Sequence, residues 1–505
     1  MSTIGPPYDV ILRNGKLVDG SGQPAFTADL AIRGERLAQI GNLEHAKAIK
    51  EIDVAGLVVA PGFIDVHTHD DSAVISRPEM TAKLTQGVTT VIGGNCGISA
   101  APYGRAGDPP EILRLVFKSD KFVAATFEKY LQKVTEAAPA INSAFLTGHT
   151  TLRMEVMGES LNRAAGEAEL AEMRDLLTQC LEQGSLGLST GLFYPSARAA
   201  SAREVIDLAR PLSAYCGVYA THMRDEADKV MESLQEALQI GRAIGAPVII
   251  SHHKCMGRNN FGRSVETLAL LQRARQHQPV ALDVYPYTAC STVLNEEMVQ
   301  KSLKTLITWC DRYPDFCARD LEEVAFALGC SPINAVSRLQ PAGAVYFMMD
   351  EADVSRILCS PEAMIGSDGL PEDQHPHPRL WGTFPRVLGR YVRERNVLSL
   401  EDAVHRMTGL SARHFGLHNR GRIEVGRYAD LCIFDSKTVL DSATYDVPTA
   451  PAIGIQYVFV NGRMALEDGV PTPIRAGKTL RRKDLTDSEI AIAEPQEFQV
   501  TDTER

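Results

Sequence analysis

Two histidines, His67 and His69, follow the short apolar run Gly62–Val66 and are separated by one residue. Side chains alternate between the two faces of a strand, so residues i and i+2 project from the same face. Two imidazoles at the end of a strand can bind one metal ion, or they can make ordinary hydrogen bonds. Further ligands at neighbouring strand ends would favour the metal site.

Such ligands follow other apolar runs of the chain. Barrel enzymes place their chemistry at strand ends, and imidazole and thiolate ligands together favour zinc. Alternation lets only one of His252 and His253 face the site, and we take His252, which shares a face with Ile250. The candidate ligands at separate run ends are Cys96, His222, His252 and Asp368.

Asp368 lies between Ser367 and Gly369 at the end of the last apolar run. Near a metal-activated water, a carboxylate can accept a proton and later return it to a leaving group. The flanking glycine also fits a structural Asp that caps a loop. The convergence of four histidines and a cysteine favours the catalytic interpretation.

Eight β-like runs alternate with helical segments after Ala60. Helical periodicity marks Ala168–Gln183 and Asp228–Ile244, where apolar residues recur every three or four positions. Alternating strands and helices predict an α/β fold with a parallel sheet, and eight units fit a closed (β/α)8 TIM-like barrel. An open, doubly wound sheet is the alternative. The runs are Gly62–His69, Val88–Cys96, Ala144–His149, Leu186–Thr190, Val218–His222, Val248–His252, Val280–Tyr285 and Met364–Asp368.

Short β-like segments also occupy both ends of the chain. Val10–Leu12 and Lys16–Val18 flank Asn14-Gly15, a pair typical of tight turns, and similar segments return after Asn419. We predict a small β-sandwich domain built from residues 1–60 and 419–475, beside a barrel over residues 61–418. The charged and polar tail, residues 476–505, is expected to wrap the surface or fray.

A long segment, Pro286–Ala363, separates the seventh run from the eighth. Long insertions on the active face of a barrel usually form lids or binding loops. We therefore predict a mobile cover over about residues 287–347.

The composition excludes several classes of protein. The chain has 505 residues, 44% of them hydrophobic, and a formal net charge of −11 with scattered acidic residues. It has no basic patch for nucleic acid, no apolar run of ~18 residues for a membrane span, and no signal-peptide pattern. Ten irregularly spaced cysteines without a Cys-x-x-Cys pair are typical of a cytosolic protein. We expect a cytoplasmic protein with a small-molecule partner, and the oligomeric state stays open.

These motifs together resemble the amidohydrolase superfamily, and within it the N-acyl-D-amino-acid deacylases (D-aminoacylases). The superfamily resemblance rests on Pro61–His69 between two β segments. The deacylase resemblance extends from about Tyr8 to Gly469. It rests on Gly94–Gly97, Thr221–Arg224, Ser251–Lys254, Tyr285–Thr288 and Gly366–Gly369.

The resemblance implies zinc-dependent hydrolysis of the amide bond of N-acyl-D-amino acids. It implies a tight zinc held by Cys96, His222 and His252, and a weaker second metal position. His67 and His69 line that second position, with Cys96 and Asp368 nearby. Many superfamily members bridge two metals with a carboxylated lysine on the fourth strand. Leu186–Thr190 contains no lysine, which fits the deacylase subgroup and puts full occupancy of two metal sites in doubt.

The resemblance also implies roles around the metal. Zinc lowers the pKa of water and polarises the scissile carbonyl, and Asp368 passes the proton of the water to the departing amine. Tyr194 would donate a hydrogen bond to the carbonyl oxygen, although an aromatic side chain packed under the rim fits the sequence equally well.

The substrate carboxylate needs a cation or hydroxyl donors. Lys254 and Arg379 are the candidate cations, and Tyr285 and Ser291 are the candidate donors.

Side-chain preference depends on one position. In relatives that act on acidic substrates, a basic residue follows the Tyr-Pro-Tyr segment, and Met298 stands where we look for it. Its adaptable thioether favours neutral, hydrophobic D-residues, whereas nearby Lys301 and Lys304 keep acidic substrates open.

Three alternative functions follow from the same sequence. The first is an N-acyl-D-glutamate or N-acyl-D-aspartate deacylase. The second is an amidohydrolase of the cyclic-imide or dihydropyrimidine type, which the missing lysine disfavours. The third is a non-catalytic scaffold, which the complete set of ligand types disfavours.

Overall fold

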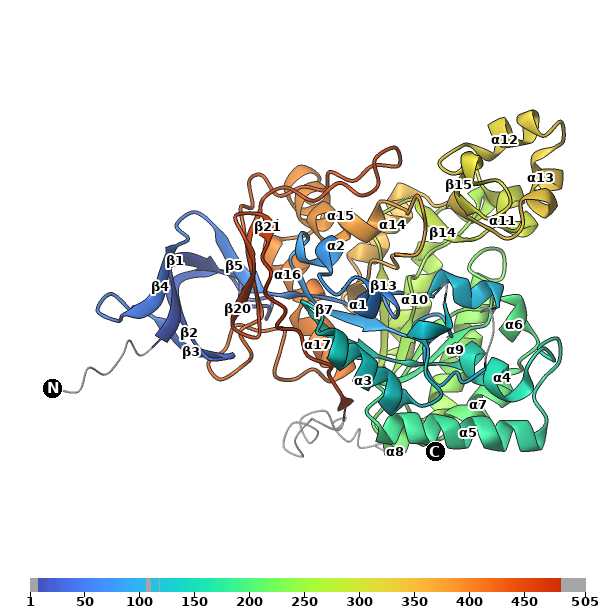
Figure 1. Ribbon diagram of the computed structural model, residues 1–505, viewed down its shortest axis with the longest axis horizontal. Helices are drawn as coiled ribbons and strands as arrows, with labels where there is room; N and C mark the ends of the chain where they lie inside the picture. The colour runs from blue at the N-terminus through green and yellow to red at the C-terminus, as the bar shows by residue number, and fades with distance from the viewer. Residues whose placement is uncertain (1–7, 106–109, 118, 483–505) are drawn as a thin grey trace, which may run out of the picture.

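The computed structural model describes residues 8–105, 110–117 and 119–482. They form a barrel with a smaller β domain beside it, at the left of Figure 1. Residues 1–7 of the predicted sandwich and residues 483–505 of the predicted tail lie outside the described residues.

The predicted (β/α)8 barrel is confirmed. In the described part of the chain, parallel strands fill eight positions around the barrel, and a parallel bridge between Thr68 and Gly369 joins the first position to the last. Residues 142–148 fill the third position as a strand interrupted at Leu146. The strands are β6 (Phe63–Asp65), β7 (Val88–Gly93), β8 (Asn142–Phe145), β9 (Thr147–Gly148), β10 (Gly187–Gly191), β11 (Val218–His222), β12 (Val248–Ile250), β13 (Val280–Val284) and β17 (Ala363–Ile365).

Strand alternation divides the barrel core into two layers. In β11, Val218 and Ala220 join a cluster that fills the barrel interior, whereas Tyr219 packs among side chains of the outer helices. Both faces of these strands are therefore buried, which explains why they read as continuous apolar runs.

The helices cover the outside of the barrel, as helical periodicity predicted. The segment predicted at Asp228–Ile244 forms α9 (Val230–Ile244), which ends where Gly245 takes a left-handed conformation with φ +66°. The segment predicted at Ala168–Gln183 forms α5 (Glu167–Glu182). The other barrel helices are α1 (Ala73–Ser76), α2 (Thr81–Leu84), α3 (Phe127–Ala137), α4 (His149–Met157), α6 (Pro195–Arg198), α7 (Ala202–Ala209), α8 (Pro211–Ala214), α10 (Ser264–Ala274), α14 (Glu351–Leu358), α15 (Arg379–Arg386), α16 (Leu400–Met407) and α17 (Gly409–Phe415), with a π-helix at Val387–Glu394.

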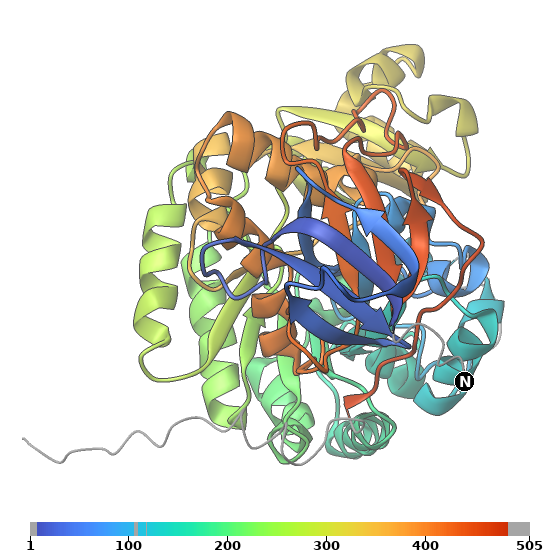
Figure 2. The same cartoon turned by 90° about the vertical axis from the view of Figure 1, so that its left-hand side faces the viewer.

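Strands from both ends of the chain form one sheet. Within the described residues it has nine strands in the order β21-β20-β19-β18-β5-β1-β2-β3, with β4 also paired to β1. Figure 2 shows the N-terminal strands beside the C-terminal ones. Leu12, Ile52 and Phe459 share one apolar cluster, so distant parts of the sheet face a common core. The strands are β1 (Tyr8–Leu17), β2 (Phe26–Arg33), β3 (Arg36–Gly41), β4 (Ala48–Asp53), β5 (Val58–Pro61), β18 (Leu431–Phe434), β19 (Ile455–Val460), β20 (Arg463–Glu467) and β21 (Val470–Pro471).

The tight turn predicted at Asn14-Gly15 is wrong. Both residues lie inside the single strand β1, where the register against β2 shifts between Leu12 and Gly15. Asn14 has φ +60°, and its backbone N–H donates to Asp29 Oδ1 at 2.9 Å. Because Asn tolerates the left-handed region, the pair forms a bulge in a strand that continues, instead of reversing the chain.

The insertion between β13 and β17 forms a separate three-stranded sheet with its own helices, at the upper right of Figure 1. The strand β16 lies between the other two. The elements are β14 (Ala289–Val293), α11 (Glu296–Lys301), β15 (Lys304–Cys310), α12 (Leu321–Ala327), α13 (Pro332–Leu339) and β16 (Ala342–Phe347). Part of this insertion reaches the candidate site described below.

The start of the predicted tail runs along the barrel. The backbone N–H of Ser143 donates to Lys478 at 2.9 Å, and that of Leu480 donates to Ser143 at 2.8 Å. Across the residues that the structure describes, every helix is too short or too polar to cross a membrane.

Candidate metal centre

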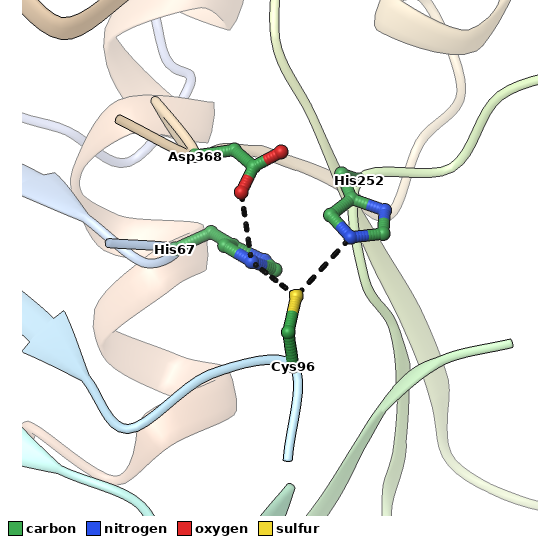
Figure 3. A group of neighbouring side chains, drawn as sticks. All are labelled: His67, Cys96, His252 and Asp368. Atoms are coloured by element: carbon green, nitrogen blue, oxygen red, sulfur yellow. Dashed lines mark hydrogen bonds and ion pairs between the residues drawn. The ribbon is translucent and has the colours of Figure 1, made fainter. Parts of the chain in front are cut away.

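Four predicted ligands converge at the carboxyl ends of the barrel strands (Figure 3). Their ligand atoms all lie within 4.8 Å of one another. Cys96 Sγ lies 3.3 Å from both His67 Nε2 and His252 Nε2, and Asp368 Oδ1 lies 3.5 Å from His67 Nε2. All four side chains are buried, so the strands bring together a thiol, two imidazoles and a carboxyl group that are far apart in sequence.

The two remaining predicted histidines border this cluster. His69 Nε2 lies 3.1 Å from Asp368 Oδ1. The His222 ring packs edge-on against His252, with ring centroids 4.4 Å apart. In the described part of the chain, neither ring nitrogen of the buried His222 has a hydrogen-bond partner. Glu226 Oε2 lies 3.4 Å from His222 Nε2 but accepts no hydrogen bond from it. A buried imidazole without hydrogen bonds fits a metal ligand, because buried polar groups are normally hydrogen-bonded. The donor set therefore fits zinc.

Backbone conformation is unusual at the same positions. Cys96, His252 and Asp368 have φ of +53°, +36° and +50°. Residues other than glycine rarely adopt this region, and such strain is found where the surrounding structure fixes a functional side chain. The three side chains are therefore held by backbone geometry as well as by packing.

The cluster favours the thiolate form of Cys96. Burial alone would raise the pKa of the thiol, but the nearby imidazoles of His67 and His252 outweigh it and hold the pKa well below its usual value. The thiolate is the form of cysteine that binds metal.

Asp368 is held ionised by a fully buried arginine. Arg379 Nη1 lies 2.8 Å from Asp368 Oδ2, and Arg379 Nη2 donates to the Ser291 carbonyl at 3.2 Å. Burial would raise the pKa of Asp368, but Arg379 and His252 outweigh burial and hold the pKa well below its ordinary value. The carboxylate is thus available to accept a proton beside the cluster.

A narrow cavity reaches this cluster and is lined by predicted residues. Tyr194 is one of them, and its hydroxyl lies 3.3 Å from Thr292 Oγ1. Burial, together with the charge of Cys96, raises the pKa of Tyr194 well above its ordinary value, so the phenol remains a donor. The predicted residues along the wall are His69, Tyr194, His222, His252, Lys254, Ser291, Met298 and Asp368.

Both predicted cations already have acidic partners. The Lys254 ammonium lies 2.8 Å from each oxygen of Glu226 and 2.7 Å from His252 Nδ1. Arg379 pairs with Asp368 and is not among the residues that line the cavity. Its guanidinium carbon lies 4.6 Å from the centroid of the Tyr285 ring. The Tyr285 hydroxyl is buried without a hydrogen-bond partner among the described residues. Lys254 is the predicted cation that lines the cavity.

Sequence reasoning missed Asp283, a buried carboxylate in β13. Its carboxylate lies 3.2 Å from His67 Nδ1, and its Oδ1 accepts from the His252 backbone N–H at 2.8 Å. A carboxylate on the outer nitrogen of a metal-binding imidazole fixes the tautomer and the ring orientation. A lone Asp within the apolar run Val280–Val284 was the available signal.

Glu226 was the second omission. Its Oε1 lies 3.1 Å from His252 Nδ1 and its Oε2 lies 3.4 Å from His222 Nε2. Glu226 stands in the segment after β11, where no periodicity indicates its direction.

Comparisons with known proteins identify relatives over most of the chain. The model of the amidohydrolase family matches residues 50–258 and 309–465. The chain is 51% identical to a D-aminoacylase of Alcaligenes xylosoxydans xylosoxydans over 94% of this chain and 98% of the relative. It is 48% identical to an N-acyl-D-aspartate deacylase of the same organism, over 94% and 95% of the two chains.

A solved structure is similar over the same extent. It is an N-acyl-D-glutamate deacylase from Bordetella bronchiseptica, in complex with zinc and a phosphonate inhibitor that mimics the tetrahedral intermediate of the reaction. Its sequence is 44% identical, its TM-score is 0.90, and the match covers 94% of this chain and 99% of that one.

Proposed function

The chain belongs to the amidohydrolase family, and on that basis we propose that it hydrolyses the amide bond of N-acyl-D-amino acids to a carboxylate and a free D-amino acid. The observation that carries the proposal is the buried convergence of His67, Cys96, His252 and Asp368, with His222 packed against His252 at one cavity. The names of the similar proteins support the substrate class.

The proposed cofactor is zinc. Cys96, His222 and His252 would hold a tight ion, and His67 and His69 would line a weaker position close to Asp368. When bound, zinc supplies Lewis acidity that acidifies water and polarises a carbonyl group.

The residues of the chain would carry the proton and orient the substrate. Asp368, ionised beside Arg379, takes a proton from the attacking water and returns it to the departing amine. Tyr194 donates a hydrogen bond to the carbonyl oxygen as negative charge develops there. The nearby Thr292 hydroxyl supports that orientation of the phenol.

The proposed site for the substrate carboxylate is the Lys254 ammonium on the cavity wall, with Ser291 as a nearby hydroxyl. Both carboxylate oxygens of Glu226 accept from the Lys254 ammonium and so fix where its charge lies. Arg379 and Tyr285 would support this site from outside the lining of the cavity.

Lys254→Ala should raise KM for the free-acid substrate far more than for its carboxamide. Equal effects on the two substrates would contradict the role of Lys254 in binding the carboxylate.

A neutral, hydrophobic side chain on the substrate is favoured by the cavity wall. Met298 lies there with Leu115, Met256 and Leu370. Lys301 and Lys304, the residues that kept acidic substrates open, are not among the lining residues described. Lys301 pairs with Glu297 at 3.2 Å, and Lys304 has a side chain 53% exposed.

We further propose that three parts of the chain have different roles. Residues 61–418 form the catalytic domain, residues 1–60 and 419–475 form the β-sandwich domain, and about 287–347 act as a mobile lid. Amide exchange in the lid as slow as in the barrel strands would contradict its mobility.

The ten cysteines form no disulfide in the described structure, which supports a cytoplasmic location.

The deciding experiment compares N-acetyl-D-methionine with its L-enantiomer, using zinc-replete protein and amine release as the readout. We expect strong preference for the D-enantiomer, with Asp368→Asn as the background control. Bound zinc without hydrolysis of either enantiomer would keep the metal site and exclude the deacylase, and a hydantoin would then be the next substrate.

A further inference from the structure

A buried lysine lies where the first and last strand positions of the barrel meet. Lys83, in α2, is 1% exposed. Its ammonium donates to Asp65 Oδ2 at 2.8 Å and to Ser367 Oγ at 3.0 Å, and it lies 3.1 Å from Asp70 Oδ2. These three partners are themselves buried, so one cation joins groups from the first and last strand positions.

The partners of Lys83 flank the predicted metal ligands. Asp65 precedes His67 by two residues, Asp70 directly follows His69, and Ser367 directly precedes Asp368. The ammonium therefore holds the chain on both sides of the paired histidines and beside the carboxylate that faces them.

Asp65 extends the connection to the backbone. Its Oδ1 accepts the Ser367 backbone N–H at 2.8 Å and that of His67 at 3.4 Å. The Asp368 backbone N–H in turn donates to the His67 carbonyl at 2.7 Å. Side-chain and backbone contacts thus hold His67 and Asp368 close together.

Lys83 itself does not line the described cavity, and its ammonium contacts none of the predicted ligands. Burial would lower the pKa of Lys83, but Asp65 and Asp70 outweigh burial and raise it, so the ammonium keeps its charge.

We propose that Lys83 is a positioning residue that fixes the paired histidines His67 and His69 relative to Asp368. It acts through Asp65, Asp70 and Ser367, and it sets the geometry of the weaker metal position and of the proton acceptor. The role of Asp368 rests on the proposed function, whereas the effect on metal affinity does not.

The test is Lys83→Met, which keeps an unbranched side chain and removes the charge. Arg420→Met is the matched control, because Arg420 is also buried and paired with a carboxylate, Asp430, and lies outside the candidate site. Four quantities are measured: melting temperature, affinity for each zinc equivalent by chelator competition, and kcat and KM for N-acetyl-D-methionine.

We expect Lys83→Met to weaken the second zinc equivalent by about 10- to 100-fold. It should lower kcat by a similar factor while KM changes less than about threefold. Arg420→Met should lower the melting temperature and leave zinc affinity and kcat near wild type. A Lys83→Met protein that loses only melting temperature, as the control does, would overturn the proposal.

Ser367→Ala decides the matter if Lys83→Met does not fold, because it keeps both ion pairs and removes the hydroxyl that accepts from Lys83 at 3.0 Å and from the Gly369 backbone N–H at 3.2 Å. Weaker second-site zinc binding supports the proposal, and unchanged binding overturns it. If the wild type hydrolyses neither enantiomer, the proposed function fails, whereas the zinc titration still tests the role of Lys83.

Discussion

Two buried polar clusters lie at opposite ends of the barrel, and they differ in how completely their groups are paired. At the amino end, Asn142 at the start of β8 meets Asp430, Arg420 and Asn461 of the C-terminal segment. Asp430 accepts from Asn142 Nδ2 at 3.1 Å and from the Asn461 backbone at 2.7 Å, and it pairs with Arg420. Asn461 Nδ2 donates to Asn142 Oδ1 at 2.8 Å. All four side chains therefore have partners.

The cluster at the carboxyl end is not completed in this way. Among the described residues, both ring nitrogens of His222 and Nδ1 of His69 lack hydrogen-bond partners. Cys96, His252 and Asp368 have left-handed backbone conformations. The difference indicates that the fully paired cluster joins two domains, whereas the incompletely paired, strained cluster is built to bind something else.

The largest expected effect comes from removing the proton acceptor. Asp368→Asn keeps the size of the side chain but replaces one accepting oxygen by a donating NH2 group and removes the basicity of the carboxylate. We expect kcat for N-acetyl-D-methionine to fall about 10³-fold. The melting temperature should also fall, because the buried Arg379 loses its carboxylate partner, so kcat is measured at a temperature where the variant is folded. A fall of less than tenfold, measured with zinc-replete protein, would remove Asp368 from the chemistry.

Removing a carboxylate from the fully paired cluster should lower the stability of the protein and leave catalysis nearly unchanged. Asp430→Ala leaves the buried Arg420 without its carboxylate, and breaking such a pair costs about 3–5 kcal/mol in the free energy of unfolding. Urea unfolding measures this loss, while kcat at low temperature should stay within about twofold. A large loss of kcat in the folded variant would erase the contrast between the two clusters.

A third buried cluster consists of Glu204, His149 and Arg153. The pH dependence of the free energy of unfolding tests how much its ion pairing contributes to stability. Burial would raise the pKa of Glu204, but the hydrogen bond with His149 and the charge of Arg153 outweigh it and lower the pKa to about 2. The ordinary value is 4.5, so the stabilisation is complete above that pH and is lost as pH falls toward 2. Glu204→Gln should be less stable than wild type by about 3 kcal/mol at pH 7.

That difference should shrink at pH 3, because the wild-type carboxylate then loses part of its advantage. Denaturant unfolding of both proteins at the two pH values gives the comparison. An equal difference at both pH values would show that the charge of Glu204 does not contribute.

The smallest expected effect lies on the cavity wall. Met298→Arg places a cation where the wall is apolar, so the ratio of kcat/KM for N-acetyl-D-glutamate over N-acetyl-D-methionine should rise about tenfold. Met298→Leu is the control and should leave the ratio nearly unchanged. No change with arginine would move the specificity pocket away from Met298.

The sequence was most informative where the physics is local. Buried parallel strands read as short apolar runs, so the strand ends that carry His67, Cys96, His222, His252 and Asp368 could be found from patterns alone. Asn14-Gly15 failed because the same residue pair suits a turn and a bulge, and pairing with β2 decides between them.

The supporting contacts could not be predicted because they depend on closure of the barrel. His67 and Asp283 are 216 residues apart in sequence, and Lys83 and Ser367 are 284 apart. Periodicity gives a residue its face on one element but not its partner on another. The pairing of Lys254 with Glu226 was missed for the same reason, although each residue stands close in sequence to a predicted ligand.

The most direct test follows D-selective hydrolysis while zinc is added back to metal-free protein. We expect no hydrolysis without metal, a rise in N-acetyl-D-methionine cleavage that is nearly complete at about one zinc per chain, and background rates for the L-enantiomer throughout. Undiminished cleavage by metal-free protein, or equal cleavage of both enantiomers, would contradict this expectation.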